Sequence, residues 1–239
     1  MSFIVAENLC LHYPVAGGTL AKMVGMPSPE TLVEINSKRY ILALNSLNFT
    51  IKDGDRIGLM GSNGSGKSTL LKVLGQIYTP TSGSVKTSGK ISSLFNINLG
   101  IQPDASGREN ILIRGLVKGW TRRQIANEMD AIIEFSGLTE FIDLPIRTYS
   151  DGMRMRLLFS IATSFSPEIL LLDEWIGAGD SKFQEKAAER MNALVKKSGI
   201  TVIASHNRPL LQRVCNKIIW LENGRIKMFD DLNKVFAII

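Results

Sequence analysis

The sequence has no long apolar run and almost no cysteine. None of its hydrophobic stretches approaches the ~20 residues that a membrane-spanning helix needs, and the opening residues, MSFIVAENL, lack the basic-then-apolar order of a secretory signal. The two cysteines, Cys10 and Cys215, do not have the spacing of a metal site, and a cytosolic chain would keep them reduced. These absences lead us to expect a cytosolic protein.

Long runs of one charge are also missing. Lys and Arg together number 28 against 22 Asp and Glu, which gives a formal net charge of +6. A basic balance suits nucleic acid, anionic lipid or a phosphate ligand. The basic residues are scattered, however, and no basic stripe interleaved with aromatic residues is present, as single-strand binders use. We therefore expect no direct contact with nucleic acid.

Strands and helices alternate along the 239 residues. Strands are expected at 3–13, 40–51, 56–60, 83–87, 91–95, Ile169–Asp173 and Thr201–Ser205. Helices are expected at Lys67–Gln76, from Thr121 to Gly137, and at Ser181–Ser198. Residues 14–37 look like a looser insertion with a short helix around Leu20–Val24. The alternation implies a largely parallel, twisted sheet, and the middle helices form a second lobe.

A glycine-rich loop follows the strand at 56–60. GSNGSGKST (61–69) fits the pattern G-x-x-x-x-G-K-[ST], after a strand and before a helix as the pattern requires. Its glycines let backbone N–H groups face phosphates, Lys67 supplies a charge to the β- and γ-phosphates, and the Ser68 hydroxyl suits Mg²⁺. The expected nucleotide-binding residues are Gly61, Ser62, Asn63, Gly64, Ser65, Gly66, Lys67, Ser68 and Thr69.

Two further strands of the buried type end in polar residues. ILLLDE (169–174) delivers two carboxylates to the edge where open α/β sheets bind ligands. There Asp173 can hold Mg²⁺ through water, and Glu174 can orient or deprotonate an attacking water. TVIASH (201–206) repeats this geometry, so that a neutral His206 can hydrogen-bond a γ-phosphate. The alternatives are a strand that simply ends in acidic residues and a solvated histidine.

Taken in order, these motifs resemble the ATP-binding cassette of ABC transporters over essentially the whole chain. Between the phosphate loop and ILLLDE stands Ser150-x-Gly152 at the start of a helix, and Gly179-Asp180 and Ser205-His206 follow. The usual signature LSGGQ is here YSDGM (149–153). Four features are similar to the subfamily that exports polysaccharides such as O-antigen, capsule and teichoic acid. They are this YSxGM followed by MRL, SGREN at 106–110, DEWIGAGD with the following Phe-Gln, and the early insertion.

The resemblance implies an α/β fold of the P-loop NTPase type, as found in ABC ATPases. Its core sheet would be mostly parallel, with an antiparallel β subdomain and a helical subdomain. We expect a single cassette over 1–239, with the core and β subdomain at about 1–95 and 166–239 and the helical subdomain at about 105–165. The chain stops soon after its last strand, at VFAII, so no C-terminal carbohydrate-binding domain is expected.

The resemblance also implies a function. The chain would be the ATPase subunit that powers export of a lipid-linked, O-antigen-like polysaccharide, which a separate transmembrane permease handles. A head-to-tail homodimer would hold two ATP molecules and Mg²⁺, at the cytoplasmic face of the inner membrane. The implied roles are catalysis for Glu174 and His206, Mg²⁺ binding for Ser68 and Asp173, contact with the partner's ATP for Ser150 and Gly152, and the dimer-interface loop for Asp180.

Some assignments remain open. An aromatic residue of the first strand region usually stacks on adenine in this family, which favours Tyr13, with Tyr40 as the alternative and simple packing as a third possibility. The usual glutamine near residue 95 falls on Asn96 or Ile97, and Gln102 is displaced from it. Asp151 would repel a γ-phosphate, so we expect its side chain to point away. The competing functions are a soluble ABC-type ATPase acting on nucleic acid or ribosomes, and a P-loop kinase or GTPase.

Overall fold

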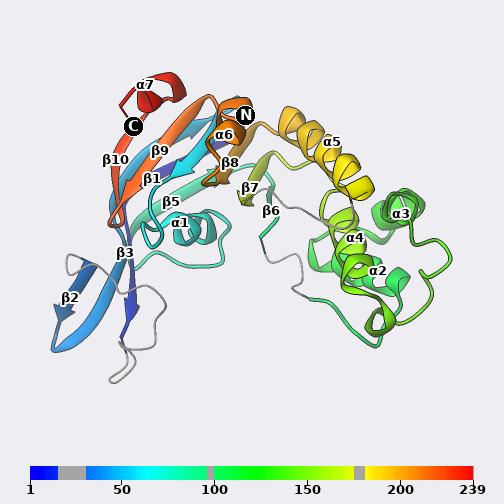
Figure 1. Cartoon of the computed structure of the whole chain (residues 1–239). Helices are drawn as coiled ribbons and strands as arrows, with labels where there is room; N and C mark the ends of the chain where they lie inside the picture. Colours follow the sequence, from blue (N-terminus) through cyan, green and yellow to red (C-terminus); the bar gives the residue numbers. More distant parts are fainter. Residues whose placement is uncertain (16–30, 96–99, 175–180, 239) are drawn as a thin grey trace. The chain divides into compact units, whose positions relative to one another are not determined.

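The computed structural model describes residues 1–15, 31–95, 100–174 and 181–238 (Figure 1). It divides into two compact units. The first comprises Met1–Ser93, Pro167–Trp175 and Ser198–Ile239, and the second comprises Leu94–Ser166 and Ile176–Lys197. The sequence placed residues 166–239 entirely in the core, whereas the contacts group helix α5 (Ser181–Lys197) with the helical unit. There Phe183 packs edge to face against Phe135 and Phe159.

A six-stranded sheet forms the centre of the first unit, in the order β10-β9-β4-β8-β7-β6. The strands are β4 (Arg56–Met60), β6 (Ile91–Ser93), β7 (Ile169–Asp173), β8 (Ile200–Ala204), β9 (Lys217–Glu222) and β10 (Arg225–Asp231). All neighbours pair in parallel except β9 and β10, which are antiparallel. The whole of β8 and the first four residues of β7 are buried, as their continuous apolar runs predict for strands covered on both faces.

A second, four-stranded sheet of the same unit is antiparallel, in the order β2-β3-β1-β5. Its strands are β1 (Phe3–Pro14), β2 (Leu32–Ile35), β3 (Lys38–Lys52) and β5 (Ser82–Ser88). Strand β2 lies within residues 14–37, so the expectation of a looser insertion there was wrong for this part. The short helix expected at Leu20–Val24 lies outside the described residues.

Helix α1 (Lys67–Leu74) contacts β7 and β8 of the first sheet and β3 and β5 of the second, and therefore lies between the two sheets (Figure 1). It ends two residues earlier than predicted, because Gly75 is the cap and Gln76 has a left-handed φ of 59°. The chain passes from β3 to β4 through a turn at Asp53-Gly54, in which the Asp55 N–H donates to the Lys52 carbonyl at 3.0 Å. Two short helices, α6 (Arg208–Val214) and α7 (Leu232–Phe236), complete the unit.

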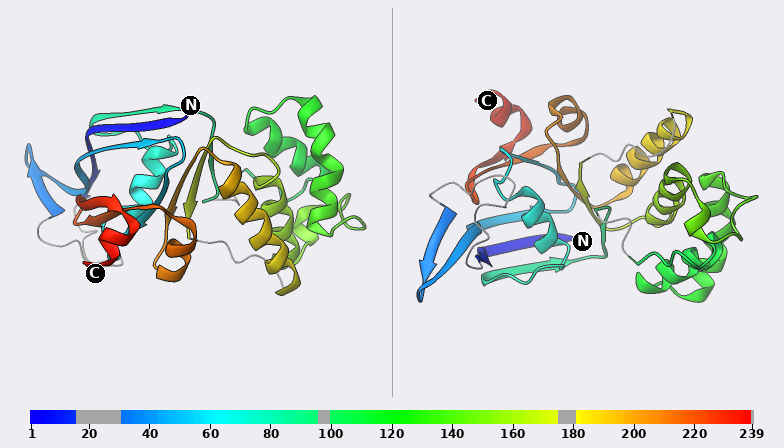
Figure 2. Two further views of the ribbon diagram at one scale, coloured as in Figure 1. Left: turned by 90° about the horizontal axis from the view of Figure 1, so that it is seen from above. Right: turned by 60° about the horizontal axis from the view of Figure 1, so that its bottom comes forward.

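The second unit consists of α2 (Gly107–Val117), α3 (Arg122–Ser136), α4 (Asp151–Ala162) and α5, which lie together in every view (Figure 2). The predicted start of α3 at Thr121 is confirmed by a capping box: Thr121 Oγ1 accepts from the Gln124 N–H, and Gln124 Oε1 accepts from the Thr121 N–H at 2.9 Å. Gly137 ends α3 with a φ of 65°. None of the helices in the described ranges is long and apolar enough to cross a membrane.

Candidate nucleotide-binding site

The phosphate loop (Gly61–Gly66) joins β4 to α1. Gly66 precedes the helix with a left-handed φ of 106°, and a Cβ atom there would lie 2.6 Å from the carbonyl oxygen of Ala43. Only glycine fits such a point. No side chain caps α1 at Gly66, so the N–H groups of its first turn remain available. A helix start of this kind, with its positive dipole end, attracts phosphate.

Lys67 lies inside the loop. Its side chain is only 8% exposed, and its Nζ donates to the carbonyl oxygens of Gly61 at 2.8 Å and Ser62 at 2.9 Å. Burial lowers the pKa of Lys67, while the charges of Asp173 and Glu174 act in the opposite direction. The two carboxylates that the sequence assigned to this site are therefore within electrostatic reach of the ammonium group.

The end of β7 carries these carboxylates next to the end of β8. Asp173 pairs with Ala204 across the parallel strands, and the Glu174 N–H donates to the Ala204 carbonyl at 2.8 Å. Glu174 has a φ of 64°, in the left-handed region. A glutamate rarely adopts this conformation, which costs of order 1–3 kcal/mol and concentrates at functional sites. The sequence did not predict this backbone conformation.

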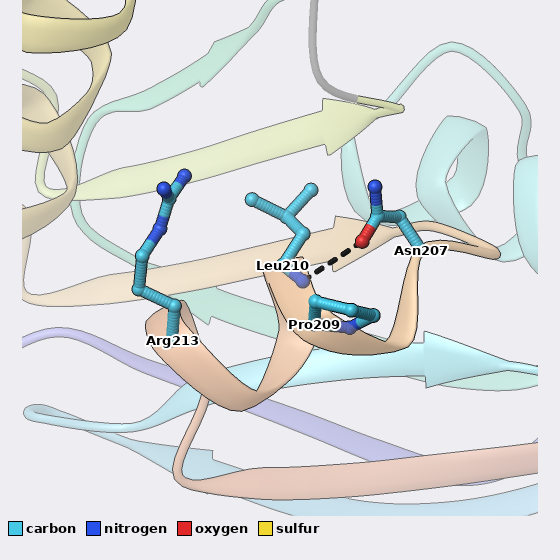
Figure 3. A pocket seen from close by; sticks show the side chains of 4 residues that line it. All are labelled: Asn207, Pro209, Leu210 and Arg213. Carbon is cyan, nitrogen blue, oxygen red and sulfur yellow. Dashed lines mark hydrogen bonds between the residues drawn. The ribbon is translucent and has the colours of Figure 1, made fainter.

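His206 lies between two residues whose backbone is fixed by side chains. The Ser205 hydroxyl accepts from the Asn207 N–H at 3.1 Å, and Asn207 Oδ1 caps α6 by accepting from the Leu210 N–H at 2.9 Å (Figure 3). His206 itself is exposed. A pocket of about 390 Å³ begins one residue later, and the described residues that line it are Asn207, Pro209, Leu210 and Arg213. None of the predicted site residues is among these four described residues.

Tyr13 lies beside the start of α1. Its hydroxyl is 3.5 Å from Thr69 Oγ1, and its ring meets the Tyr78 ring edge to face at 5.9 Å between centroids. Burial raises the pKa of Tyr13. Tyr40 instead packs against His12, with 6.3 Å between ring centroids. Of the two candidates for adenine stacking, Tyr13 is thus the one beside the phosphate loop.

The signature residues belong to the second unit. Ser150 is the N-cap of α4, and its Oγ accepts from the Met153 N–H at 3.2 Å. The Asp151 carboxylate pairs with Arg154 one turn along the helix, at 2.7 Å. A Cβ atom on Gly152 would have Ser150 Oγ as its nearest neighbour, at 3.9 Å. The start of α4 is therefore open around Gly152, and the negative charge of Asp151 already has a partner.

Asn110 is a structural residue to which the sequence assigned no role. It is fully buried, and its Oδ1 accepts from the Gln102 N–H while its Nδ2 donates to the carbonyls of Gln102, Ala105 and Ser106. One side chain thus organises the segment 102–106 ahead of α2. Gln102 is held there by its backbone. Asn96, Ile97 and Asp180 lie outside the described residues.

A comparison with protein families agrees with this arrangement. The family model described as ABC transporter matches residues 44–177, a span that starts in β3 and contains the phosphate loop, the signature and both carboxylates. The chain belongs to the ABC transporter family. The expected family and the expected class, an ATPase, are confirmed, and a kinase or GTPase that shares only the phosphate loop is excluded.

Relatives of known name cover most of this ABC transporter chain. The O-antigen export system ATP-binding protein RfbE of Yersinia enterocolitica is 45% identical over 95% of this chain and 97% of its own. The corresponding protein RfbB of Myxococcus xanthus is 44% identical over 82% of this chain. The teichoic acids export ATP-binding protein TagH of Staphylococcus saprophyticus is 39% identical over 86% of this chain and 78% of its own. The match spans only 45% of the length of the Myxococcus protein.

Solved structures of ABC cassettes share the fold. A dimeric ATP-binding cassette in a post-hydrolysis state, bound to ADP and Pi, has a TM-score of 0.69 at 22% identity and covers 96% of this chain and 98% of its own. The ATP-binding subunit of an ABC transporter has a TM-score of 0.72 at 18% identity over 98% of this chain and 92% of its own. They confirm the expected ABC-type α/β fold.

Proposed function

We propose that this chain is the ATP-hydrolysing subunit of an ABC transporter that exports a polysaccharide, an O-antigen-like glycan, through a separate transmembrane permease. The identity of 45% over nearly the full length of RfbE, a protein named for O-antigen export, carries this proposal. TagH proteins, named for teichoic acid export, support the same substrate class. These relatives do not favour a soluble ATPase acting on nucleic acid or ribosomes. The chain would lie at the cytoplasmic face of the inner membrane and touch the polysaccharide only indirectly.

The phosphate loop suits ATP in three respects. It holds a nearly buried ammonium group whose present partners are carbonyl oxygens, and a phosphate would be a stronger, charge-assisted acceptor. The buried Ser65 hydroxyl has no hydrogen-bond partner in the described structure. The start of α1 also offers free N–H groups. Tyr13 would stack on the adenine.

Ser68 and Asp173 would hold Mg²⁺. No group of three His, Cys, Asp or Glu side chains among the described residues is arranged to hold a metal, so the ion would depend on phosphate oxygens as well. When bound, Mg²⁺ neutralises charge on the phosphates and orients them. Glu174 would orient or deprotonate the attacking water, and His206 would hydrogen-bond the γ-phosphate.

The signature would contact the ATP of a second copy of the chain. Because the Ser150 oxygen already accepts from the Met153 N–H, its hydroxyl hydrogen is free to be donated to a phosphate oxygen. No described side chain crowds Gly152, whose nearest neighbour would be Ser150 Oγ at 3.9 Å, so a ligand can approach the start of α4 closely. In a head-to-tail homodimer two ATP molecules would join the subunits, and their hydrolysis would let the subunits separate. Asp180 would lie in the interface loop of this dimer.

Replacing Ser150 by alanine tests this dimer. We expect Ser150→Ala to leave the ATP affinity of the monomer within about 2-fold of the wild type, because no ligand contact within the subunit is lost. The ATP-driven dimer should weaken by at least about 100-fold, since a donor to a charged acceptor, worth about 1.5–3 kcal/mol, is lost at each of its two sites. Sedimentation velocity with ATP in a Glu174→Gln background measures the dimer, and calorimetric titration measures the monomer.

Thr121→Ala is the matched control for this test. Thr121 caps α3 in the same unit and, like Ser150, accepts from the N–H three residues along the chain, and its removal costs a similar ~1 kcal/mol of helix stability. The control should leave the dimer unchanged. If Ser150→Ala instead removes ATP affinity in the monomer, or leaves the dimer as strong as in the control, the proposed contact across the dimer is wrong.

The transport assignment is tested by the copurifying partner. A tagged chain extracted from native membranes in mild detergent should retain a membrane protein with several apolar helices. Cells that carry only an ATP-binding-deficient Lys67→Met chain should accumulate the glycan inside and lose it from the surface. Sedimentation with ribosomes or nucleic acid, together with unchanged surface glycan, would instead support the alternative function.

A further inference from the structure

The turn between β9 and β10 reaches the phosphate loop. Asn223 and Gly224 both have left-handed φ values, 47° and 74°, as in the tight turn that asparagine-glycine pairs favour in hairpins. The Gly224 N–H donates to the Ser65 carbonyl in the loop at 3.1 Å, and the Gly224 carbonyl accepts from the Asn45 N–H of β3 at 2.8 Å. A single residue of the turn is thus bonded both to the phosphate loop and to the second sheet.

Three backbone segments meet at this point with no space for a side chain. A Cβ atom on Gly224 would lie 2.9 Å from the Ala43 carbonyl oxygen, and one on Gly66 would lie 2.6 Å from the same oxygen and 3.7 Å from the Gly224 Cα. We call Ala43, Asn45, Ser65, Gly66 and Gly224 the glycine junction. These close backbone contacts leave no room for a side chain at Gly66 or at Gly224.

The side chains of Asn45 and Arg225 form a second connection at the junction. With its amide oxygen facing the guanidinium, Asn45 accepts from Nε of Arg225 at 3.0 Å and from Nη2 at 2.9 Å. Arg225 directly follows Gly224, and the backbone N–H of Asn45 donates to the Gly224 carbonyl. The same two segments are therefore connected twice, once by backbone and once by side chains.

We propose that the glycine junction is a positioning element that holds the phosphate loop in its ATP-binding shape, with Gly224 as its central residue. The reason lies in the peptide between Ser65 and Gly66. In a trans peptide the C=O and the N–H point in opposite directions. The bond from Gly224 to the Ser65 carbonyl therefore turns the Gly66 N–H away from the hairpin and presents it as a phosphate donor. This inference rests on the proposed binding of ATP by the loop.

Gly224→Ala tests the junction, with Gly54→Ala as the matched control. Gly54 has a similar φ of 88° in the same unit, but a Cβ atom there would meet nothing within 4 Å, so both variants carry comparable backbone strain. We expect Gly224→Ala to raise the Kd and KM for ATP by at least about 10-fold with kcat at saturating ATP within about 3-fold, the pattern of lost ground-state binding. Gly54→Ala should keep the wild-type Kd.

Arg225→Ala provides a second variant that does not threaten folding, because Arg225 is exposed. Arg225→Ala and Asn45→Ala should each raise the Kd for ATP by about 2- to 5-fold. The double variant should raise it no more than the larger of the two single variants, because each substitution removes the same Asn45–Arg225 hydrogen bonds. Should Gly224→Ala fail to fold, this series decides the question. Equal effects of Gly224→Ala and Gly54→Ala, or additive effects of the pair, overturn the proposal.

Two reference measurements separate failure of the junction from failure of the proposed function. The wild-type chain must bind ATP in the same titration, and Lys67→Met must lose that binding. If both hold and Gly224→Ala still binds like the control, only the junction is wrong. If the wild-type chain does not bind ATP, the assignment of the loop fails and the junction falls with it.

Discussion

Glu174→Gln is expected to lower the rate of ATP hydrolysis by about 10²–10⁴-fold while leaving ATP binding intact. The amide has the shape of the carboxylate but cannot take a proton from water. The unusual backbone of Glu174, with φ at 64°, is no worse for glutamine than for glutamate, so the fold should be unaffected. Phosphate release measures the rate, and size-exclusion chromatography with ATP should show a trapped dimer.

Glu168→Gln is the control for this variant. Glu168 is exposed and precedes the same strand, β7, at its opposite end. It has no proposed contact with ATP, and its neutralisation should leave the rate within about 2-fold of the wild type. Hydrolysis by Glu174→Gln at the wild-type rate would show that Glu174 is not the base.

Lys67→Met is expected to weaken ATP binding by about 100-fold or more. Methionine keeps the apolar stem of the side chain packed but removes the ammonium group, which is nearly buried and donates to two loop carbonyls. A buried charge-assisted contact with phosphate is worth about 1.5–3 kcal/mol, and the low local dielectric strengthens it. Calorimetric titration gives the affinity, and the stabilisation of the protein by ATP in thermal melting should disappear.

Lys72→Met is the matched control on the same helix. The Lys72 ammonium lies 5.6 Å from the centre of the Tyr78 ring, outside the phosphate loop, and the substitution changes the net charge by the same amount. We expect its ATP affinity to stay within about 3-fold of the wild type. If the two variants lose affinity equally, the effect of Lys67 is one of overall charge, not of its place in the loop.

The sequence predicted the local structure around the candidate site best where local pattern and chemistry coincide. The bounds of β4 and β7 were predicted correctly, because each contains a run of four apolar residues with a charged residue directly before it. The phosphate loop and the cap at Ser150 follow fixed spacings whose physical reasons are local. Helix α1 was predicted two residues too long, although Gly75, which caps it, is a local stop signal.

Features that depend on distant partners could not be predicted in this way. The grouping of α5 with the helical unit rests on Phe183 meeting two phenylalanines from other helices. The role of Asn110 appears only once the carbonyls that it bonds are brought together in space. The turn at Asn223-Gly224 is different, because this dipeptide between two apolar runs is a strong local hairpin signal and is predictable from the sequence alone.

The left-handed backbone at Glu174 has a consequence for protein engineering. Glycine adopts that conformation without strain, and its introduction should stabilise the folded chain by of order 1 kcal/mol. The same exchange deletes the proposed base. Stability and activity therefore oppose each other at one position, and a selection for heat resistance alone would enrich chains that bind ATP and no longer hydrolyse it.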